Sequence, residues 1–415
     1  MLKKQSIVVI LSIAMLLAAA SVIQAAPTNL TFWFYVGGPN LENIKALVDE
    51  FNQQHPSINV TVEYTPDWFQ KALTAYVGGS PPDIVWCAWY NVGDFASRGA
   101  LVNLEDRYLR PSGLYNEYAE DFYPYLWETS KYNDRIYAIP FDTNNMITFY
   151  NVDMFDSAGT EAPADDWTWS GFLDVAKKLS QRDQWGYSGG WADRHFYDFT
   201  MSAGGQGFFS ADGKEVYVDS PEAVRALEFL TDLTHKHHAA PWPLVPKAFE
   251  YGKAAMEIQG SYRIPVYREQ TKINFGVAPQ PQDKVRFSSA GGESLIMFKT
   301  NGKREDAAWT FIEWMTSSEV LAKWSVMSGY LPVRQSSANH PDYLATLQND
   351  PIRMKFVNEL QYGGRYPAVP GYAEFMNIVN KSLDEARHQA KTPADALSDA
   401  AKKGKPVLQE ASNRE

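Results

Sequence analysis

Large aromatic side chains stand at two points of the sequence where an apolar run ends. Trp33 and Tyr35 end the first run, and Trp86, Trp89 and Tyr90 end a later one. Trp and Tyr combine a broad apolar face with a polar edge. Such rings suit a ligand with apolar C–H faces and a rim of hydroxyl groups, as a sugar ring has. Ring stacking is therefore the first binding chemistry that the sequence indicates.

Polar side chains that can bond hydroxyl groups form a second set. Asp142, Asn144 and Asn145 lie close together in the chain, and Glu293 follows Gly291-Gly292. A hydroxyl group both donates and accepts hydrogen bonds, so carboxylates and amides are suitable partners for it. Two glycines in a row allow the backbone to approach a ligand closely. The alternative interpretation is that the first three residues only stabilise a turn, as polar loop residues often do.

The segments that hold the first aromatic residues predict an α/β unit. Strand–helix–strand–helix–strand at this spacing indicates a right-handed βαβαβ arrangement with a mainly parallel sheet. In open sheets of this kind, ligands bind beyond the carboxyl ends of the strands, where the aromatic residues lie. The expected elements are a strand at 30–34, a helix at 41–51 with Asn40 as its N-cap, a strand at 58–64, a helix at 68–77 and a strand at 83–86.

A second unit begins after residue 140. We expect a strand at 147–150, a helix capped by Thr168 or Ser170, and another helix that starts at Ser220 with Pro221 in its first turn. Short strands are expected at 254–258 and 275–278. From Ala307 onward the pattern is mostly helical, and the lysine-rich end is expected to be frayed.

The first 26 residues have the pattern of a secretory signal peptide. Lys3 and Lys4 precede an apolar run at 7–20, and Ala25-Ala26 follow it. The run is too short to span a membrane. Cys87 is the only cysteine, so no internal disulfide is possible and no lipid-anchoring cysteine lies near the cleavage point. We expect a secreted product in the periplasm or outside the cell, with the exact cleavage site left open.

Charge and motifs argue against several classes of function. The net charge is −11 and no basic cluster occurs, so nucleic acid is not an expected partner. His235, His237 and His238 end a helix without a nearby acidic or cysteine ligand, so no metal and no cofactor are expected. Nucleophile elbows, metal signatures and phosphate loops are missing. A glycoside hydrolase stays open, because Asp142 and Glu293 could meet in the fold.

A series of segments over nearly all of the chain after residue 26 resembles the extracellular solute-binding proteins of family 1, the maltose-binding-protein-like receptors of ABC importers. Each segment is weakly diagnostic alone, and their order is what carries the resemblance. They are 79–85 (GSPPDIV), 149–155 (FYNVDMF), 163–179 with its WTW and AKKL, 252–260 (GKAAMEIQG), Gly291-Gly292, 307–312 (AAWTFI) and 329–334 (GYLPVR).

The resemblance implies the periplasmic-binding-protein fold of class II, in which two discontinuous Rossmann-like α/β lobes are joined by a hinge. It places chain crossings near 142–146, near 288–292 and near residue 339. The first lobe would hold residues 27–141 and 291–340, the second 142–290 and 341–405, and 406–415 would be a tail. The function implied is capture of a neutral di- or oligosaccharide by a monomer that delivers it to the membrane permease of an ABC importer.

The resemblance also implies which residues contact the ligand. In the first lobe it favours Trp89 and Tyr90, while Trp86 could equally be core. The full expected set is Trp33, Tyr35, Trp86, Trp89, Tyr90, Asp142, Asn144, Asn145, Trp191, Arg194, Trp242, Tyr262, Gly291, Gly292, Glu293, Arg365 and Tyr372. The alternatives to a sugar receptor are a secreted glycoside hydrolase and a receptor for a polyol or glycerol phosphate. Which sugar, which permease and any chemoreceptor partner stay open.

Overall fold

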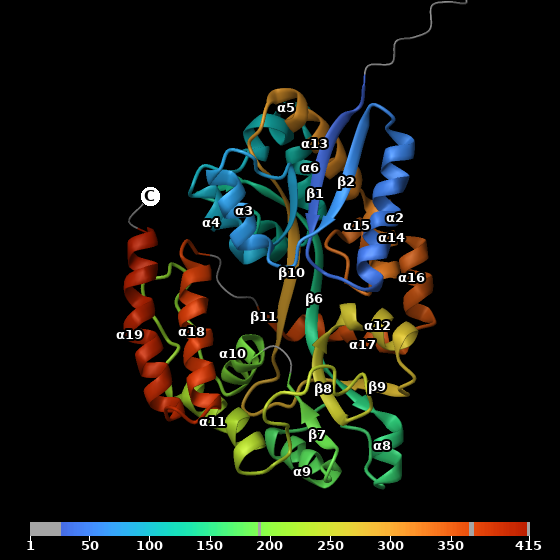
Figure 1. The fold of residues 1–415 in the computed structure, drawn as a ribbon. Coiled ribbons are helices and arrows are strands. Elements are labelled where there is room, and N and C mark those ends of the chain that lie inside the picture. Colours follow the sequence, from blue (N-terminus) through green and yellow to red (C-terminus); the bar gives the residue numbers. More distant parts are fainter. Residues whose placement is uncertain (1–25, 190–191, 365–368, 413–415) are drawn as a thin grey trace, which may run out of the picture.

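The computed structural model describes residues 26–189, 192–364 and 369–412. Figure 1 shows two lobes, one above the other, connected by the two long strands β6 and β10. The main sheet has the strand order β2-β1-β3-β10-β6-β8-β7, with β9 paired to β6 and β11 to β10. The strands of this sheet are β1 (Thr28–Phe34), β2 (Ile58–Tyr64), β3 (Ile84–Ala88), β6 (Ala138–Asn151), β7 (Trp185–Ser188), β8 (Ala254–Gly260), β9 (Phe275–Ala278), β10 (Ser288–Met297) and β11 (Gly363–Gly364).

The first lobe confirms the expected βαβαβ unit. Strand β1 is parallel to both β2 and β3, and the connecting helices are α2 (Pro39–Gln54) and α3 (Trp68–Val77). Phe32 and Phe34 of β1 are fully buried in the core of the lobe. The N-cap expectation is wrong: Gly38 caps α2, and Asn40 lies inside the helix, buried, where its Nδ2 donates to Tyr262 O at 3.4 Å.

Strands β6 and β10 belong to both lobes. Their upper parts pair antiparallel with each other, and β10 also pairs with β3 of the first lobe. The lower part of β6 pairs with β8 and β9 of the second lobe. The ladder between β6 and β10 contains a β-bulge, because Glu293 pairs with Asp142 while Ser294 pairs with Pro140. A bulge bends a strand and re-aims its side chains, and here it lies where the chain leaves the first lobe.

The remaining helices cover the sheet from both sides. In the first lobe they are α4 (Val92–Ala96), α5 (Arg110–Ser112), α6 (Leu114–Asp121), α7 (Pro124–Glu128), α13 (Gly302–Met315), α14 (Ser318–Ser328) and α15 (Gln335–Ala338), beside the small β4 (Lys131–Tyr132) and β5 (Arg135–Ile136). Farther along, α16 (Pro341–Gln348) packs on α14, and α17 (Pro351–Glu359) packs on β6 and β9.

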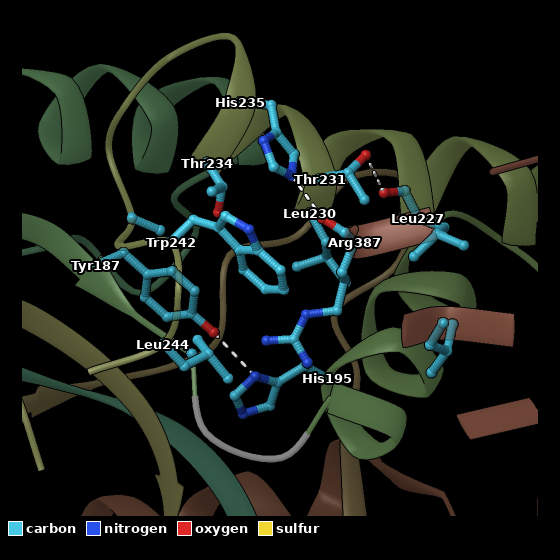
Figure 2. Close-up of a pocket in the computed structure, with 13 residues that line it drawn as sticks. Tyr187, His195, Leu227, Leu230, Thr231, Thr234, His235, Trp242, Leu244 and Arg387 are labelled. Carbon is cyan, nitrogen blue, oxygen red and sulfur yellow. Dashed lines mark hydrogen bonds between the residues drawn. The ribbon is translucent and has the colours of Figure 1, made fainter. Parts of the chain in front are cut away.

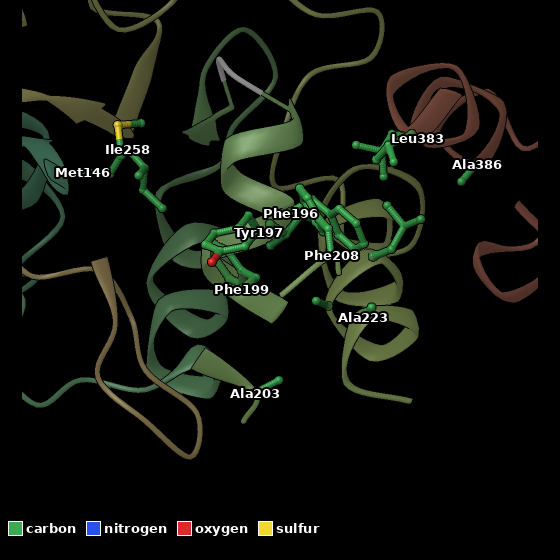
Figure 3. Close-up of a cluster of buried hydrophobic side chains, with 14 of the residues drawn as sticks. Met146, Phe196, Tyr197, Phe199, Ala203, Phe208, Ala223, Ile258, Leu383 and Ala386 are labelled. Carbon is green, nitrogen blue, oxygen red and sulfur yellow. The ribbon is translucent and has the colours of Figure 1, made fainter. Parts of the chain in front are cut away.

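The second lobe is built on an aromatic core. Its helices are α8 (Val152–Ser157), α9 (Trp169–Leu179), α10 (Ala192–Ser202), α11 (Pro221–His235), α12 (Ile264–Gln270), α18 (Tyr372–Arg387) and α19 (Pro393–Ser412). Figure 3 shows Phe196, Tyr197 and Phe199 of α10 beside Phe208, between the sheet and the helices that carry Ala223 and Leu383.

Local signals in the second lobe are mostly confirmed. Thr168 caps α9 and accepts a hydrogen bond from Gly171 N, and Ser220 caps α11 and accepts one from Ala223 N. The expectation of a frayed tail from 406 is wrong for the described part, because α19 continues to Ser412 and buries Leu408. No helix among the described residues is long and apolar enough to cross a membrane.

Candidate ligand site at the hinge

Asp142 forms the centre of a buried polar cluster at the hinge. Its Oδ2 accepts hydrogen bonds from two indole groups, Trp324 Nε1 at 2.9 Å and Trp86 Nε1 at 3.2 Å. Its Oδ1 accepts from Glu293 N at 3.2 Å. Asp142 is buried, so both oxygens face protein donors. We expected Asp142 to accept hydrogen bonds from ligand hydroxyl groups, but its oxygens accept them from the protein instead.

Glu293 lies directly opposite Asp142 on β10, and it is only partly buried. Its Oε1 accepts from Tyr35 OH at 2.8 Å, whereas its Oε2 receives no hydrogen bond from a donor among the described residues. Burial, and next the charge of Glu293, raise the pKa of Asp142 well above its usual value. Burial also raises the pKa of Glu293, and bonds from Asp142 and Tyr35 and the charge of Arg194 oppose that rise.

The two asparagines of β6 face different ways. Asn145 Nδ2 donates to Phe356 O of α17 at 2.9 Å, so Asn145 belongs to the packing of that helix. Asn144 Oδ1 is buried and has no partner among the described residues. It lies on the side of Tyr262, because a Cβ built on Gly260 would meet both Tyr262 and Asn144 Oδ1, the latter at 3.0 Å. Successive strand residues point to opposite faces, which explains the difference.

Aromatic rings surround this cluster. Tyr35 packs against Trp86 with ring centroids 4.5 Å apart. Tyr262 stacks on Tyr330 at 5.4 Å with an interplanar angle of 22°, and Tyr330 stacks on Trp324 at 5.9 Å. Tyr35 and Tyr262 are partly exposed, whereas Trp86 and Trp324 are fully buried. The first pair can therefore face a ligand, and the two tryptophans support the site from behind.

Arg194 of α10 brings a positive charge to the same place. Its guanidinium donates to Ser289 Oγ at 3.0 Å and to Ser289 O at 2.9 Å. It lies against Gly291, where a Cβ would be 2.8 Å from a guanidinium nitrogen. Behind it, Asp198 accepts from Gln280 Nε2 at 2.6 Å and from Ser289 N at 3.0 Å, and burial raises the pKa of Asp198 to about 6.

Side chains of the first lobe also touch the second lobe directly. Tyr90 packs on Tyr372, the first residue of α18, with centroids 4.7 Å apart. Trp89 is buried among side chains of the second-lobe core. Asp94 Oδ1 accepts from Gly371 N at 3.2 Å. These contacts hold the lobes together on the side of α18, so the conformation described is closed there.

Several expected site residues lie elsewhere. Trp33 donates from Nε1 to Glu63 Oε2 at 2.7 Å and borders a surface pocket with Pro81 and Pro82. His195, which follows Arg194 but was not among the expected residues, bridges Tyr187 OH and Ile258 O within the second lobe, and burial lowers its pKa to about 4. Trp191 and Arg365 lie outside the described residues.

Trp242 lies in a separate pocket of the second lobe, a cavity of about 60 Å³ between α11 and the end of α18. Figure 2 shows its indole beside His235 and Arg387, with the Arg387 guanidinium pointing toward His195. The indole packs edge-on against His235 and His388. This pocket shares no lining residue with the hinge cluster.

The structure adds two residues that the sequence reasoning missed. Tyr330 follows Gly329 in a segment already noted for its family-like pattern, so its position was a usable signal. Trp324 lies in the middle of α14, where nothing local distinguishes it from an ordinary core residue. Both meet Asp142 or its neighbours only through the tertiary fold.

The chain has two α/β lobes, a hinge made of strands and a polar cluster beside that hinge. This combination is typical of a solute-binding protein. The sequence profile of the bacterial extracellular solute-binding proteins matches residues 46–355, and the chain belongs to that family.

Relatives with known names span almost the same length. A maltotriose-binding protein of Pyrococcus abyssi is 25% identical, with 86% of this chain and 77% of that protein covered. The sn-glycerol-3-phosphate-binding periplasmic protein of Escherichia coli is 22% identical, with 92% and 93% covered. An ABC substrate-binding protein of Listeria monocytogenes, solved in complex with cycloalternan, superposes with a TM-score of 0.83 at 25% identity, covering 92% of this chain and 99% of that one.

Proposed function

We propose that this protein is the substrate-binding component of an ABC importer, and that it captures a neutral di- or oligosaccharide at the hinge and delivers it to the membrane permease. The observation that carries the proposal is the pair of unpartnered acceptors, Glu293 Oε2 and Asn144 Oδ1, beside the partly exposed rings of Tyr35 and Tyr262. Buried acceptors without donors are costly, and ligand hydroxyls would supply the missing donors.

A neutral ligand fits this site better than a phosphorylated one. A phosphate group needs several cationic or N–H donors. Arg194 is already bonded to Ser289, and Arg263 forms an ion pair with Glu250. Glu293 adds negative charge at the same place. The relatives include glycerol-phosphate receptors, so sn-glycerol-3-phosphate is the comparison ligand that any binding test requires.

Binding without catalysis is part of the proposal. A glycosidase holds its two carboxyl groups roughly 5–10 Å apart, on either side of the bond it cleaves. Asp142 and Glu293 are instead paired directly across β6 and β10, Glu293 N donates to Asp142, and Asp142 is covered by two indole groups. Directly paired residues on adjacent strands leave no room for a sugar between them. We extend the same proposal to a secreted monomer without a lipid anchor that binds no nucleic acid.

Isothermal titration calorimetry on the mature protein tests the proposal. The panel contains maltose, maltotriose, a monosaccharide and sn-glycerol-3-phosphate, and chromatography of each recovered sugar reports cleavage. We expect one of the oligosaccharides to bind and to be recovered intact. Binding of sn-glycerol-3-phosphate alone would replace the sugar assignment, and a cleaved sugar would replace the receptor with an enzyme.

A further inference from the structure

The buried carboxyl pair at the hinge has a function that neither residue has alone. We infer that Asp142 acts on the ligand through Glu293: the two carboxyl groups share one proton where β6 meets β10, and this proton fixes the orientation in which Glu293 accepts from the ligand. In this role Asp142 is a positioning residue. The inference rests on the proposed function only in assigning Glu293 to the ligand.

The donors around the two carboxyl groups are consistent with one shared proton. Asp142 receives its three bonds from two indoles and one backbone N–H, and Glu293 receives one from Tyr35. These four donors leave Glu293 Oε2 with no donor among the described residues. The two residues are cross-strand neighbours, Glu293 N donates to Asp142 Oδ1, and the charge of Glu293 acts on Asp142. Two adjacent carboxylates in a largely buried place do not both ionise, and one shared proton removes the repulsion. The second lone pair of Glu293 Oε2 stays open to a ligand hydroxyl.

The geometry keeps the proton in place. The indoles of Trp86 and Trp324 hold Asp142 from β3 and from α14, so its carboxyl group has no second orientation that keeps both bonds. The bulge lies next to this pair, where Glu293 is paired with Asp142 and its backbone N–H donates to Asp142 Oδ1. Glu293 is therefore held between Tyr35 and Asp142, and the charges of Glu293 and of Arg194 from the second lobe interact.

The other groups that face the pair do not titrate in the same range. Loss of solvent around the hydroxyl groups raises the pKa of Tyr35, Tyr90, Tyr262 and Tyr330, that of Tyr262 to about 12. Arg194 stays charged. On α10, burial raises the pKa of Asp193 and that of Asp198, the latter to about 6, and these two groups face Arg194. Cys87 of β3 also interacts with Glu293, and burial raises the pKa of its thiol well above the usual value. Among the described groups named here, Asp193 and Asp198 add to the acid side of a pH profile.

The first test needs no ligand. Protein labelled with ¹³C at the Asp and Glu side-chain carboxyl groups is titrated with acid and base and followed by NMR. The carboxyl signals that are missing from the spectra of Asp142→Asn and Glu293→Gln identify the pair. At pH 7 we expect one proton on the pair, with the two signals titrating together. Two independent carboxylates with ordinary pKa values would overturn the inference. If Asp142→Asn does not fold, Glu293→Gln still assigns one of the two signals, and the coupled titration is read from that signal.

The second test measures the dissociation constant of the bound oligosaccharide between pH 5 and pH 9.5. The wild type should bind most tightly in the middle of this pH range. On the alkaline side its affinity should fall by up to about tenfold per pH unit as the shared proton leaves. Asp142→Asn should lose that alkaline fall, and Asp142→Ala should bind weakly at every pH. An alkaline fall that persists in Asp142→Asn would overturn the inference. If no sugar binds, the proposed function fails, while the NMR result still decides whether the proton is shared.

Discussion

Gly291 and Gly292 are neighbours on β10, and alanine at these two positions should have different effects. A Cβ on Gly292 would lie 2.3 Å from Asp142 O and 3.0 Å from the Thr143 Cα. These are backbone atoms of the adjacent strand, so the overlap can be relieved only by moving β6 and β10 apart at the hinge. Overpacking of this kind typically costs about 1–3 kcal/mol, and a backbone clash belongs at the upper end of that range.

A Cβ on Gly291 meets a flexible side chain instead. It would lie 2.8 Å and 2.9 Å from the two terminal nitrogens of Arg194. The guanidinium can move away, which breaks its two bonds to Ser289. Because Arg194 is partly exposed, water replaces much of what is lost, and the stiffer unfolded chain returns about 0.4–1 kcal/mol. The net change in stability should be on the order of 1 kcal/mol, but the displaced Arg194 then occupies the ligand site.

Urea denaturation and calorimetry of both variants separate the two effects. We expect Gly292→Ala to lower the free energy of unfolding by about 3 kcal/mol or more. Gly291→Ala should lower it by only about 1 kcal/mol but weaken sugar binding about tenfold or more, a loss of roughly 1.4 kcal/mol. Gly171→Ala is the matched control, because the nearest atom to its new Cβ, Thr168 Oγ1, is 3.8 Å away. Equal stability of the two hinge variants would refute the packing argument, and unchanged affinity of Gly291→Ala would remove Arg194 from the site.

Three further predictions concern the aromatic residues and Asp198. Tyr262→Ala should weaken sugar binding by about 1–3 kcal/mol, the value of a large apolar face, as measured by calorimetry; a drop in melting temperature with intact affinity would contradict it. Trp89→Ala should increase the radius of gyration of the ligand-free protein in small-angle scattering, because Trp89 of the first lobe is buried in the second-lobe core; an unchanged radius would place it in a single-lobe core. Burial raises the pKa of Asp198 to about 6, so the wild type should lose stability as the pH rises from about 4 through 6, by about 3 kcal/mol at most. Asp198→Asn should lack that loss when unfolding is measured across this range, and parallel curves for both proteins would show that Asp198 does not titrate there.

Local patterns were enough to predict the elements of both lobes. The alternation of buried and exposed side chains in β2 and the buried face of α2 are both set by residues a few positions apart. Ser220 followed by Pro221 marks the start of a helix without any further signal. The error at Asn40 has a physical reason. Gly38, with φ of 68°, makes the turn into α2, so the helix begins at Pro39 and takes Asn40 inside.

The site could be predicted only in part, because its bonds join distant parts of the chain. Asp142 meets Trp324 across 182 residues, and Tyr35 meets Glu293 across 258. Residue type alone suggested that Asp142 binds ligand hydroxyls, but the fold gives both of its oxygens to protein donors. Trp33 and Tyr35 pack on the same cluster of the first lobe, yet only Tyr35 lies beyond the end of β1 and reaches the hinge.

Placing the acceptors on the hinge strands connects binding with closure. Asn144 and Glu293 lie on β6 and β10, which continue from one lobe into the other. Tyr35 approaches them from the first lobe, whereas Tyr262 and Arg194 approach from the second. A ligand bonded to the hinge can contact both sets of side chains only when the lobes are closed, and that difference in contacts is what shifts the population toward the closed state. The direct contact between Tyr90 and Tyr372 adds to the closed state without any ligand. This aromatic contact therefore contributes part of the free energy of closing, and the ligand has to contribute only the remainder.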